Sequence, residues 1–255
     1  MAFIEFRNVK KAFDEKRVYE SLTLDVERGE SLTVIGGSGQ GKSVMLKLLI
    51  GLLRPDAGSI VFDGQELTSK NELEFQDVRK RIGMLFQSSA LFDSLRVADN
   101  VAYGLHEHLH MSESEVKQRV AESLSAVGLP EIEDMWPSDL SGGMKKRVGL
   151  ARAIALKPEV LLYDEPTTGL DPINTTRINR LIIRLRETLN VTSIVVTHDM
   201  QSAFKISDRI VMIYNGRVIF SGTPDEVRAA KEPLVRDFVL GHAPEEEVLD
   251  ELLIS

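Results

Sequence analysis

The sequence predicts an α/β fold with a mainly parallel core β-sheet, an antiparallel β portion and a helical subdomain. Three observations support this prediction. Short apolar runs alternate with helical patterns, which is typical of strands buried in a parallel sheet. A glycine-rich loop joins one of these runs to a helix. Strand signals also disappear between about residues 88 and 157, where helical periodicity dominates.

The first part of the chain carries most of the expected strands. Each is a short run of apolar and β-branched residues bounded by turn-forming residues. The expected strands are Phe3–Val9, Ser21–Val26, Ser31–Ile35, Ser59–Phe62 and the run ending in Ile82–Gln87. A helix is expected from about Lys42 to Leu52, where Gly51 and Pro55 help to end it.

Strands return after a helical segment that includes ESEVKQRVAESLSAVGL, which ends on Gly128. Glu159–Asp164 and Ser193–His198 are predicted strands separated by the helix INTTRINRLIIRLRETL. Asn215-Gly216 lies between two further strand runs and predicts a hairpin. We therefore expect one domain over residues 1–240 and a tail at 241–255. This domain would comprise a core lobe (1–87 and 158–222), a helical subdomain (88–157) and C-terminal helices (223–240).

The composition is that of an ordinary globular protein, with 43% hydrophobic residues, 27% charged residues and a formal net charge of −8. Such acidity argues against a general nucleic-acid binder. Because the chain has no cysteine, disulfides and thiolate metal sites are excluded. The N-terminus lacks the apolar segment of a signal peptide, and Val44–Leu53 is too short to cross a bilayer. We expect a cytoplasmic protein that acts at a membrane only through a partner.

The segment GGSGQGKS satisfies the phosphate-binding pattern G-x-x-x-x-G-K-S. Its glycines allow backbone N–H groups to face phosphates, and the helix that follows adds positive potential. Lys42 would reach the β- and γ-phosphates of a nucleotide and Ser43 would hold Mg²⁺. The alternative, a chance glycine-rich turn, is disfavoured by the order strand, loop, helix. The predicted phosphate loop comprises Gly36, Gly37, Ser38, Gly39, Gln40, Gly41, Lys42 and Ser43.

Polar residues at the ends of later strands would complete this site, because ligands bind at the carboxyl ends of strands in open α/β sheets. Asp164 would join the Mg²⁺ shell, and Glu165 would orient and polarise the attacking water. His198 would contact the γ-phosphate, and Gln87 would touch Mg²⁺ or the water. The alternative for each is a strand that merely ends in a polar residue. The predicted catalytic residues are Glu165, His198 and Gln87, and the predicted metal ligands are Ser43, Gln87 and Asp164.

These motifs together resemble the ATP-binding subunit of ABC transporters. GGSGQGKS, Gln87, LSGGM (Leu140–Met144), LLYDEP, TGLD (Thr168–Asp171) and His198 occur in the order of that family. The resemblance extends from about Phe3 to Gly222. It implies a P-loop NTPase of ABC type that binds ATP and Mg²⁺ and hydrolyses the ATP.

The resemblance also implies a role for LSGGM. Ser141, Gly142 and Gly143 would cap a helix running to about Ala155, and their N–H groups would form a second anion nest. Two copies of the chain would sit head to tail, so that this nest covers the γ-phosphate held by the other copy. Asp171 would lie at the seam and help to align the opposite site.

Two positions depart from the pattern of this family, and a third is the aromatic position expected to contact adenine. Met144 stands where many relatives carry glutamine, and Gln40 where a small residue is usual. Since both lie beside glycine backbones, we expect them to tune activity rather than abolish it. Phe13 occupies the aromatic position that would stack on adenine, with ordinary core packing as the alternative.

The segments FQSSALFDSLRVADNVAYGL, LSGGM, KKRVGLARAIAL and PLVRDFVLG are most similar to the ATPase of Mla/Mce-type lipid transporters. This similarity implies phospholipid transport between membranes and a peripheral position at the cytoplasmic face of the inner membrane. The implied partners are a permease dimer, an MCE-domain protein and a small STAS-domain protein. The alternatives are an importer ATPase for a small solute such as an amino acid, a soluble ABC-type machine, and a regulatory ATP-binding module without turnover.

Two further segments leave alternatives open. HEHLH, at His106–His110, is interpreted as a polar helix surface; the alternative is a zinc-protease site, because the segment matches the pattern H-E-x-x-H, in which both histidines share a helix face. The tail HAPEEEVLDELLIS permits a short amphipathic docking helix or a frayed acidic end.

Overall fold

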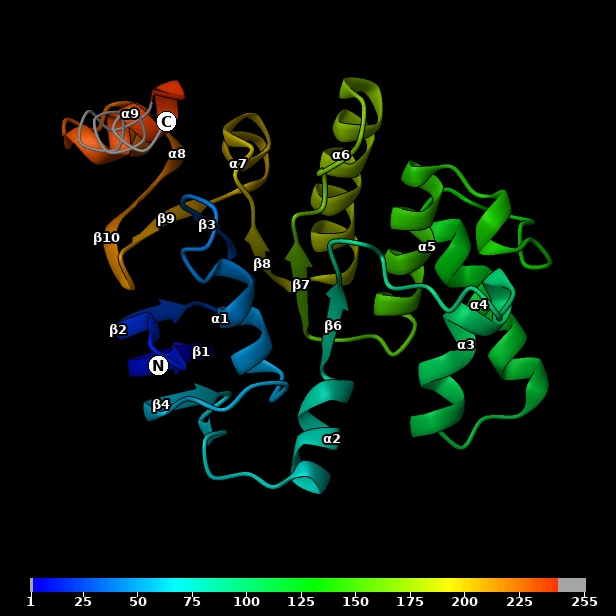
Figure 1. The fold of residues 1–255 in the computed structure, drawn as a ribbon. Coiled ribbons are helices and arrows are strands. Elements are labelled where there is room, and N and C mark those ends of the chain that lie inside the picture. The colour runs from blue at the N-terminus through cyan, green and yellow to red at the C-terminus, as the bar shows by residue number, and fades with distance from the viewer. Residues whose placement is uncertain (1, 243–255) are drawn as a thin grey trace.

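The computed structural model describes residues 2–242, which form two β-sheets with helices between and beside them (Figure 1). The larger sheet has the order β10-β9-β3-β8-β7-β6. Its parallel strands are β6 (Ile82–Leu85), β7 (Val160–Asp164), β8 (Thr192–Val196), β3 (Ser31–Ile35) and β9 (Arg209–Tyr214), with β10 (Arg217–Gly222) antiparallel at one edge. The predicted α/β class with a mainly parallel core sheet is confirmed.

The smaller sheet is the expected antiparallel portion. Its order is β2-β1-β4-β5, formed by β1 (Ile4–Phe13), β2 (Lys16–Val26), β4 (Ala57–Phe62) and β5 (Gln65–Glu66). β1 runs four residues beyond the predicted end at Val9, because pairing with β2 continues through register shifts to Phe13. This extension carries Phe13 to the far end of the hairpin.

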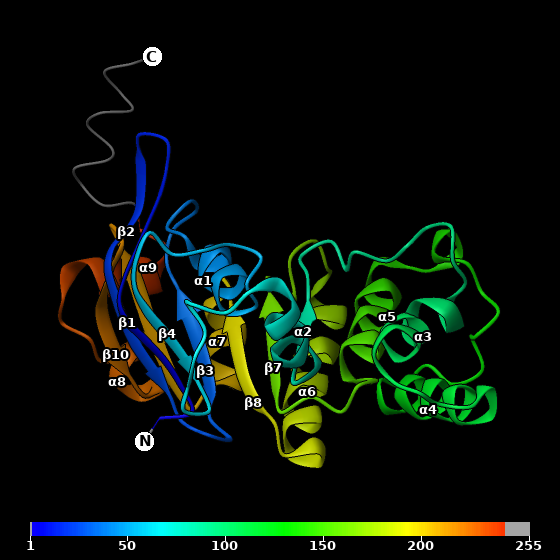
Figure 2. The same ribbon diagram turned by 90° about the horizontal axis from the view of Figure 1, so that it is seen from below.

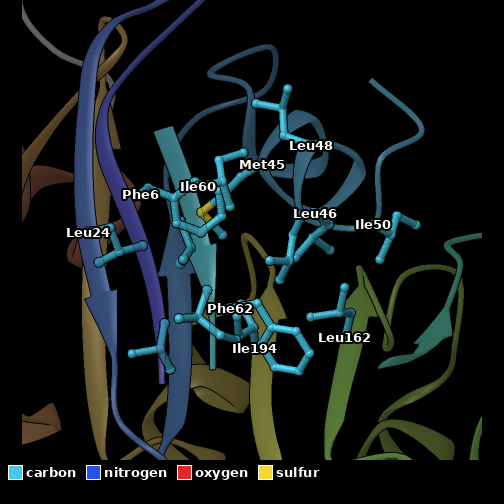
Figure 3. Close-up of a cluster of buried hydrophobic side chains, with 14 of the residues drawn as sticks. Phe6, Leu24, Met45, Leu46, Leu48, Ile50, Ile60, Phe62, Leu162 and Ile194 are labelled. Atoms are coloured by element: carbon cyan, nitrogen blue, oxygen red, sulfur yellow. The ribbon is translucent and has the colours of Figure 1, made fainter. Parts of the chain in front are cut away.

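The core forms where helix α1 (Lys42–Leu49) fills the space between the two sheets (Figure 3). Met45 and Leu46 of this helix belong to one buried cluster with Ile60 of the small sheet and Leu162 and Ile194 of the large one. Strands β3, β7 and β8 are buried at every position, which explains their nearly unbroken apolar sequences. Packing on both sides therefore fixes the loop that precedes α1.

The segment between β6 and β7 contains helices and, among the described residues, no strand, as predicted. These helices are α3 (Val97–His108), α4 (Glu113–Ala126), the 3₁₀ turn η1 (Pro137–Asp139) and α5 (Gly142–Ile154). They lie beside β6 and β7 at one end of the molecule (Figure 2). A second hydrophobic cluster joins them to the large sheet and to helix α6 (Pro172–Leu189).

Two helices of the core were absent from the sequence prediction. Helix α2 (Glu72–Lys80) begins with a capping box between Asn71 and Glu74, yet buries only Phe75 and Val78. Helix α7 (Met200–Ile206) is only seven residues long. Such short segments carry too few apolar positions to establish a helical period.

The C-terminal segment contains two short helices and follows a hairpin. Helices α8 (Pro224–Arg228) and α9 (Pro233–Leu240) lie within the expected 223–240 segment. The predicted hairpin joins β9 to β10, with positive φ at Asn215 (45°) and Gly216 (71°). Most of the proposed tail, residues 243–255, lies outside the described residues. No helix in the part of the chain that the structure describes is long and apolar enough to cross a membrane.

Candidate functional site

The phosphate loop lies between β3 and α1, where its glycines are needed for two different reasons. A Cβ on Gly36 would lie 2.4 Å from the carbonyl oxygen of Ile213, so the adjacent strand leaves no room for one. Gly41 has a φ of 90°, and a Cβ there would lie 2.5 Å from Val18. The hydroxyl of Tyr19 donates to the Gly41 carbonyl at 2.5 Å and fixes the end of the loop. The predicted strand–loop–helix geometry is thus present.

Lys42 folds its side chain back over this loop. Its Nζ donates to the carbonyl oxygens of Gly36 (2.7 Å) and Gly37 (3.0 Å). Burial lowers the pKa of Lys42, while the carboxylates of Glu165 and Asp164 partly oppose that shift. The loop therefore holds a desolvated cation at the place where phosphates would meet the backbone N–H groups.

Ser43 and Asp164 meet at the mouth of the loop. Ser43 Oγ donates to Asp164 Oδ1 at 2.6 Å, although the two residues are 121 positions apart in the sequence, because α1 begins at the edge of the sheet where β7 ends. A hydroxyl, a carboxylate and the nearby amide of Gln87 are the hard oxygen donors that suit Mg²⁺. These residues fit that ion.

Glu165 is held in an unusual conformation directly after β7. Its φ of 47° lies in the left-handed region, which costs a non-glycine residue on the order of 1–3 kcal/mol. Its Oε2 atom lies 3.0 Å from His198 Nδ1 and accepts from Thr168 Oγ1 at 3.1 Å and Thr197 Oγ1 at 3.4 Å. The carboxylate is largely buried whereas His198 is exposed. Both predicted residues thus lie together at neighbouring strand ends.

A cavity of about 930 Å³ joins these groups. Of the predicted site residues, its walls include Phe13, Gly37, Ser38, Gly39, Gly41, Lys42, Ser43, Gln87, Glu165 and His198. Sequence reasoning missed several further wall residues, namely Lys16, Val18, Phe238, Gly241 and His242. Lys16 and Val18 come from β2, whereas Phe238, Gly241 and His242 come from α9 and the residues after it; no local pattern in the sequence could indicate that these segments meet.

Phe13 and Gln40 take up distinct positions around this cavity. Phe13 is 41% exposed, which excludes core packing and leaves its ring available for stacking. Gln40 turns away from the cavity, since its Oε1 accepts the backbone N–H of Asn215 at 2.7 Å. The unexpected glutamine therefore ties the phosphate loop to the β9–β10 turn.

The LSGGM segment forms the predicted helix start. Ser141 caps α5 and accepts the N–H of Met144 at 3.3 Å, and the helix runs from Gly142 to Ile154. Ser141 and Gly142 are exposed, while Gly143 packs against Asn174. None of these three lines the cavity of its own chain. The exposed part of this turn, Ser141 and Gly142, therefore lies outside the cavity formed by the phosphate loop.

Asp171 caps the neighbouring helix α6. Its Oδ1 accepts the N–H groups of Ile173 and Asn174, each at 2.9 Å, and Asn174 donates to its other oxygen. These hydrogen bonds, those from Asn174 above all, lower the pKa of Asp171. The carboxylate stays exposed and ionised at neutral pH.

The zinc-protease geometry suggested by HEHLH does not form. Helix α3 ends at His108, and Leu109 is extended with a ψ of 143°. His106 and His110 therefore do not share a helix face, which that pattern requires. Among the described residues there is also no group of three or more potential metal-binding side chains of His, Cys, Asp or Glu.

The family model of ABC transporters matches residues 19–168, which include the phosphate loop, LSGGM and Glu165. The chain belongs to the ABC transporter family. It is an ATPase and binds nucleotide. The predicted resemblance is confirmed.

Three curated relatives span most of the chain. It is 43% identical to the intermembrane phospholipid transport system ATP-binding protein MlaF of Haemophilus influenzae, covering 94% of this chain and 91% of that protein. It is 41% identical to the probable ribonucleotide transport ATP-binding protein mkl of Mycobacterium leprae, covering 93% and 69%. It is 40% identical to the chloroplastic protein TRIGALACTOSYLDIACYLGLYCEROL 3 of Arabidopsis thaliana, covering 93% and 73%.

A solved structure also resembles the chain along most of its length. The ATP-binding cassette MJ0796, in a dimeric post-hydrolysis state with ADP and Pi, superposes with a TM-score of 0.80 at 31% identity. The superposition covers 87% of this chain and 98% of that one.

Proposed function

We propose that this chain is the ATP-hydrolysing subunit of a transporter that moves phospholipids between membranes. The assignment of phospholipid as the cargo rests on the 43% identity, over nearly the whole length of both chains, to a protein named for intermembrane phospholipid transport. The proposed mechanism of ATP hydrolysis rests on the cavity that is lined by the phosphate loop, Glu165 and His198.

Phosphate binding would be the task of the loop and Lys42. Residues Gly37 to Ser43 lead into the start of α1, where the helix dipole favours anions, so their N–H groups would bind the phosphates. The Lys42 ammonium, now on the carbonyls of Gly36 and Gly37, would exchange these partners for the β- and γ-phosphate oxygens. Phe13 would provide the stacking surface for adenine.

Ser43, Asp164 and Gln87 would hold Mg²⁺. When bound, the ion would neutralise charge on the phosphates and stabilise the departing ADP as a leaving group. The hydrogen bond between Ser43 and Asp164 supports this assignment, because it holds two oxygen donors side by side before the ion binds. Asp164 would remain the only full negative charge among these three ligands.

Glu165 would orient the attacking water and accept its proton. Its neighbours support this role: Thr168 and Thr197 hold the carboxylate, and His198 lies beside it at the open side of the cavity. His198 would contact the γ-phosphate and keep Glu165 pointed towards it. Because Glu165 is buried, its carboxylate would accept the proton in an environment with little competing water.

Two copies of the chain would act together. The helix start at Ser141 does not line the cavity of its own chain, so its N–H groups would suit the γ-phosphate held by a second copy in head-to-tail arrangement. Asp171 would lie at the seam between the copies. The dimeric state of a structural relative bound to ADP and Pi supports this arrangement. ATP would close the dimer, and hydrolysis would release it.

The partners would be a membrane permease dimer, an MCE-domain protein and a small STAS-domain protein. The chain would bind the permease peripherally at the cytoplasmic face of the inner membrane. Its net charge of −8 supports a role without nucleic acid.

This proposal is tested by isolating the tagged full-length chain from detergent-solubilised membranes and identifying proteins and lipids that copurify. We expect a permease, an MCE-domain protein and bound phospholipid. Recovery of a different permease with a solute-binding protein would leave the ATPase assignment intact and contradict the lipid assignment.

A further inference from the structure

Lys146 is a buried lysine that the chemistry described so far does not use. It lies on α5, five positions after Ser141, and is only 5% exposed. Its Nζ donates to the carbonyl oxygen of Gln87 and, at 3.2 Å, to the carbonyl oxygen of Glu165. A lysine is almost never buried to this extent unless its charge has specific partners. Here those partners are the backbones of two predicted catalytic residues.

The two carbonyls leave the sheet at neighbouring strand ends. β6 and β7 are parallel and adjacent, with Leu85 paired to Tyr163. Gln87 and Glu165 follow these strands by two residues and one residue, respectively. A single ammonium therefore links both strand ends to the helix that begins at Ser141.

The link matters most at Glu165, because its backbone is strained. Its N–H donates to Val196 at 2.9 Å, and its carbonyl accepts from Lys146. The two bonds hold both sides of a residue in the left-handed region, with a φ of 47°. If the carbonyl were released, the residue could relax towards a more populated conformation and turn its carboxylate away from His198.

We propose that Lys146 is a positioning residue that fixes the direction of the Glu165 carboxylate and the path of the chain at Gln87. This inference rests on the function proposed above. It also connects two ATP sites, because Ser141 lies about 7.5 Å along the same helix and would serve the second copy. A shift of α5 when the second copy engages Ser141 is thereby transmitted to Glu165.

The test compares K146M, K146R and K146Q in the full-length chain, isolated with the membrane proteins that copurify with it. Methionine keeps the length and apolar stem but removes the charge and all donors. Arginine retains both, and glutamine retains a neutral donor. The matched control is K145M, because Lys145 is the adjacent, half-exposed lysine and its side chain makes no hydrogen bond to any described residue.

We expect K146M to lower kcat for ATP at least about tenfold while KM and the affinity for a fluorescent ATP analogue stay within about threefold of wild type. K146R should recover part of kcat, and K145M should match wild type. If K146M unfolds, as judged by its melting temperature, K146Q gives the same comparison with a retained donor, and its kcat should fall between those of wild type and of E165Q, which lacks the catalytic carboxylate.

Equal kcat values for K146M (or K146Q) and K145M would overturn the positioning role. Loss of ATP affinity in parallel with kcat would also overturn it, because the effect would then lie in the nucleotide pocket. Absence of ATPase activity in the wild-type complex is a separate result, which would refute the proposed function itself.

Discussion

Replacement of Glu165 by glutamine tests the assignment of the catalytic base. In the structure, Glu165 Oε2 lies 3.0 Å from His198 Nδ1 and accepts from Thr168 at 3.1 Å. Glutamine has nearly the same size and retains one oxygen that can accept these bonds. It lacks the negative charge and the basicity, so the substitution removes proton acceptance while preserving shape.

The expected loss follows from these contacts. Removing a positioned general base lowers the rate about 10²–10⁴-fold, or on the order of 3–5 kcal/mol of transition-state stabilisation. ATP binding should persist, because Lys42 and the loop N–H groups are untouched.

The assay combines steady-state ATP hydrolysis with gel filtration in the presence of ATP. We expect the E165Q chain to run as a dimer that retains ATP, whereas wild type cycles between open and closed states. A kcat within about threefold of wild type would refute the role of Glu165 as base. A variant that stays monomeric with ATP would contradict closure of the dimer by ATP.

Four other substitutions give separate outcomes. Phe13→Ala should weaken ATP binding about 2- to 10-fold without lowering the melting temperature, because the ring is exposed; equal affinity in a binding titration would contradict stacking. Gly36→Ala should abolish ATPase activity or folding, since its Cβ would meet the Ile213 carbonyl; a normal kcat would show that the loop can shift. Ser141→Ala should destabilise α5 by about 1 kcal/mol in chemical denaturation and impair ATP-driven dimerisation, and unchanged dimerisation would argue against a nest shared between copies. Burial lowers the pKa of Lys42 below its ordinary 10.5, so the unfolded chain binds more protons between that lowered pKa and 10.5, and stability rises with pH there; Lys42→Met should flatten this rise on the alkaline side below pH 10.5 in denaturation curves, and an unchanged slope would contradict the assignment.

The sequence predicted those parts of the site that local chemistry determines. The order of strand, glycine loop and helix predicted the phosphate loop, and in the structure Gly36 and Gly41 of this loop lie where a side chain has no room. Asp164 and His198 end predicted strands, and parallel pairing of β7 with β8 brings their segments together. Local patterns sufficed here because strand direction fixes where each strand ends.

Other features depend on packing between distant segments, which no local pattern encodes. The basic run KKR at Lys145–Arg147 is typical of a solvated helix face, yet its middle residue is buried against Glu165. Phe238 and His242 reach the cavity only because α9 packs near the phosphate loop. The left-handed conformation of Glu165 likewise follows from pairing with Val196 and has no counterpart in its sequence.

The most direct test of the account is phospholipid transfer by the isolated complex between two populations of vesicles. Fluorescent phospholipid in one population reports the transfer, with Mg²⁺ and ATP present. The account predicts transfer that requires ATP with the wild-type chain and stops with E165Q, although E165Q still binds ATP. Sustained ATP hydrolysis without lipid transfer, or equal transfer with E165Q, would contradict the claim that this ATPase drives phospholipid transport.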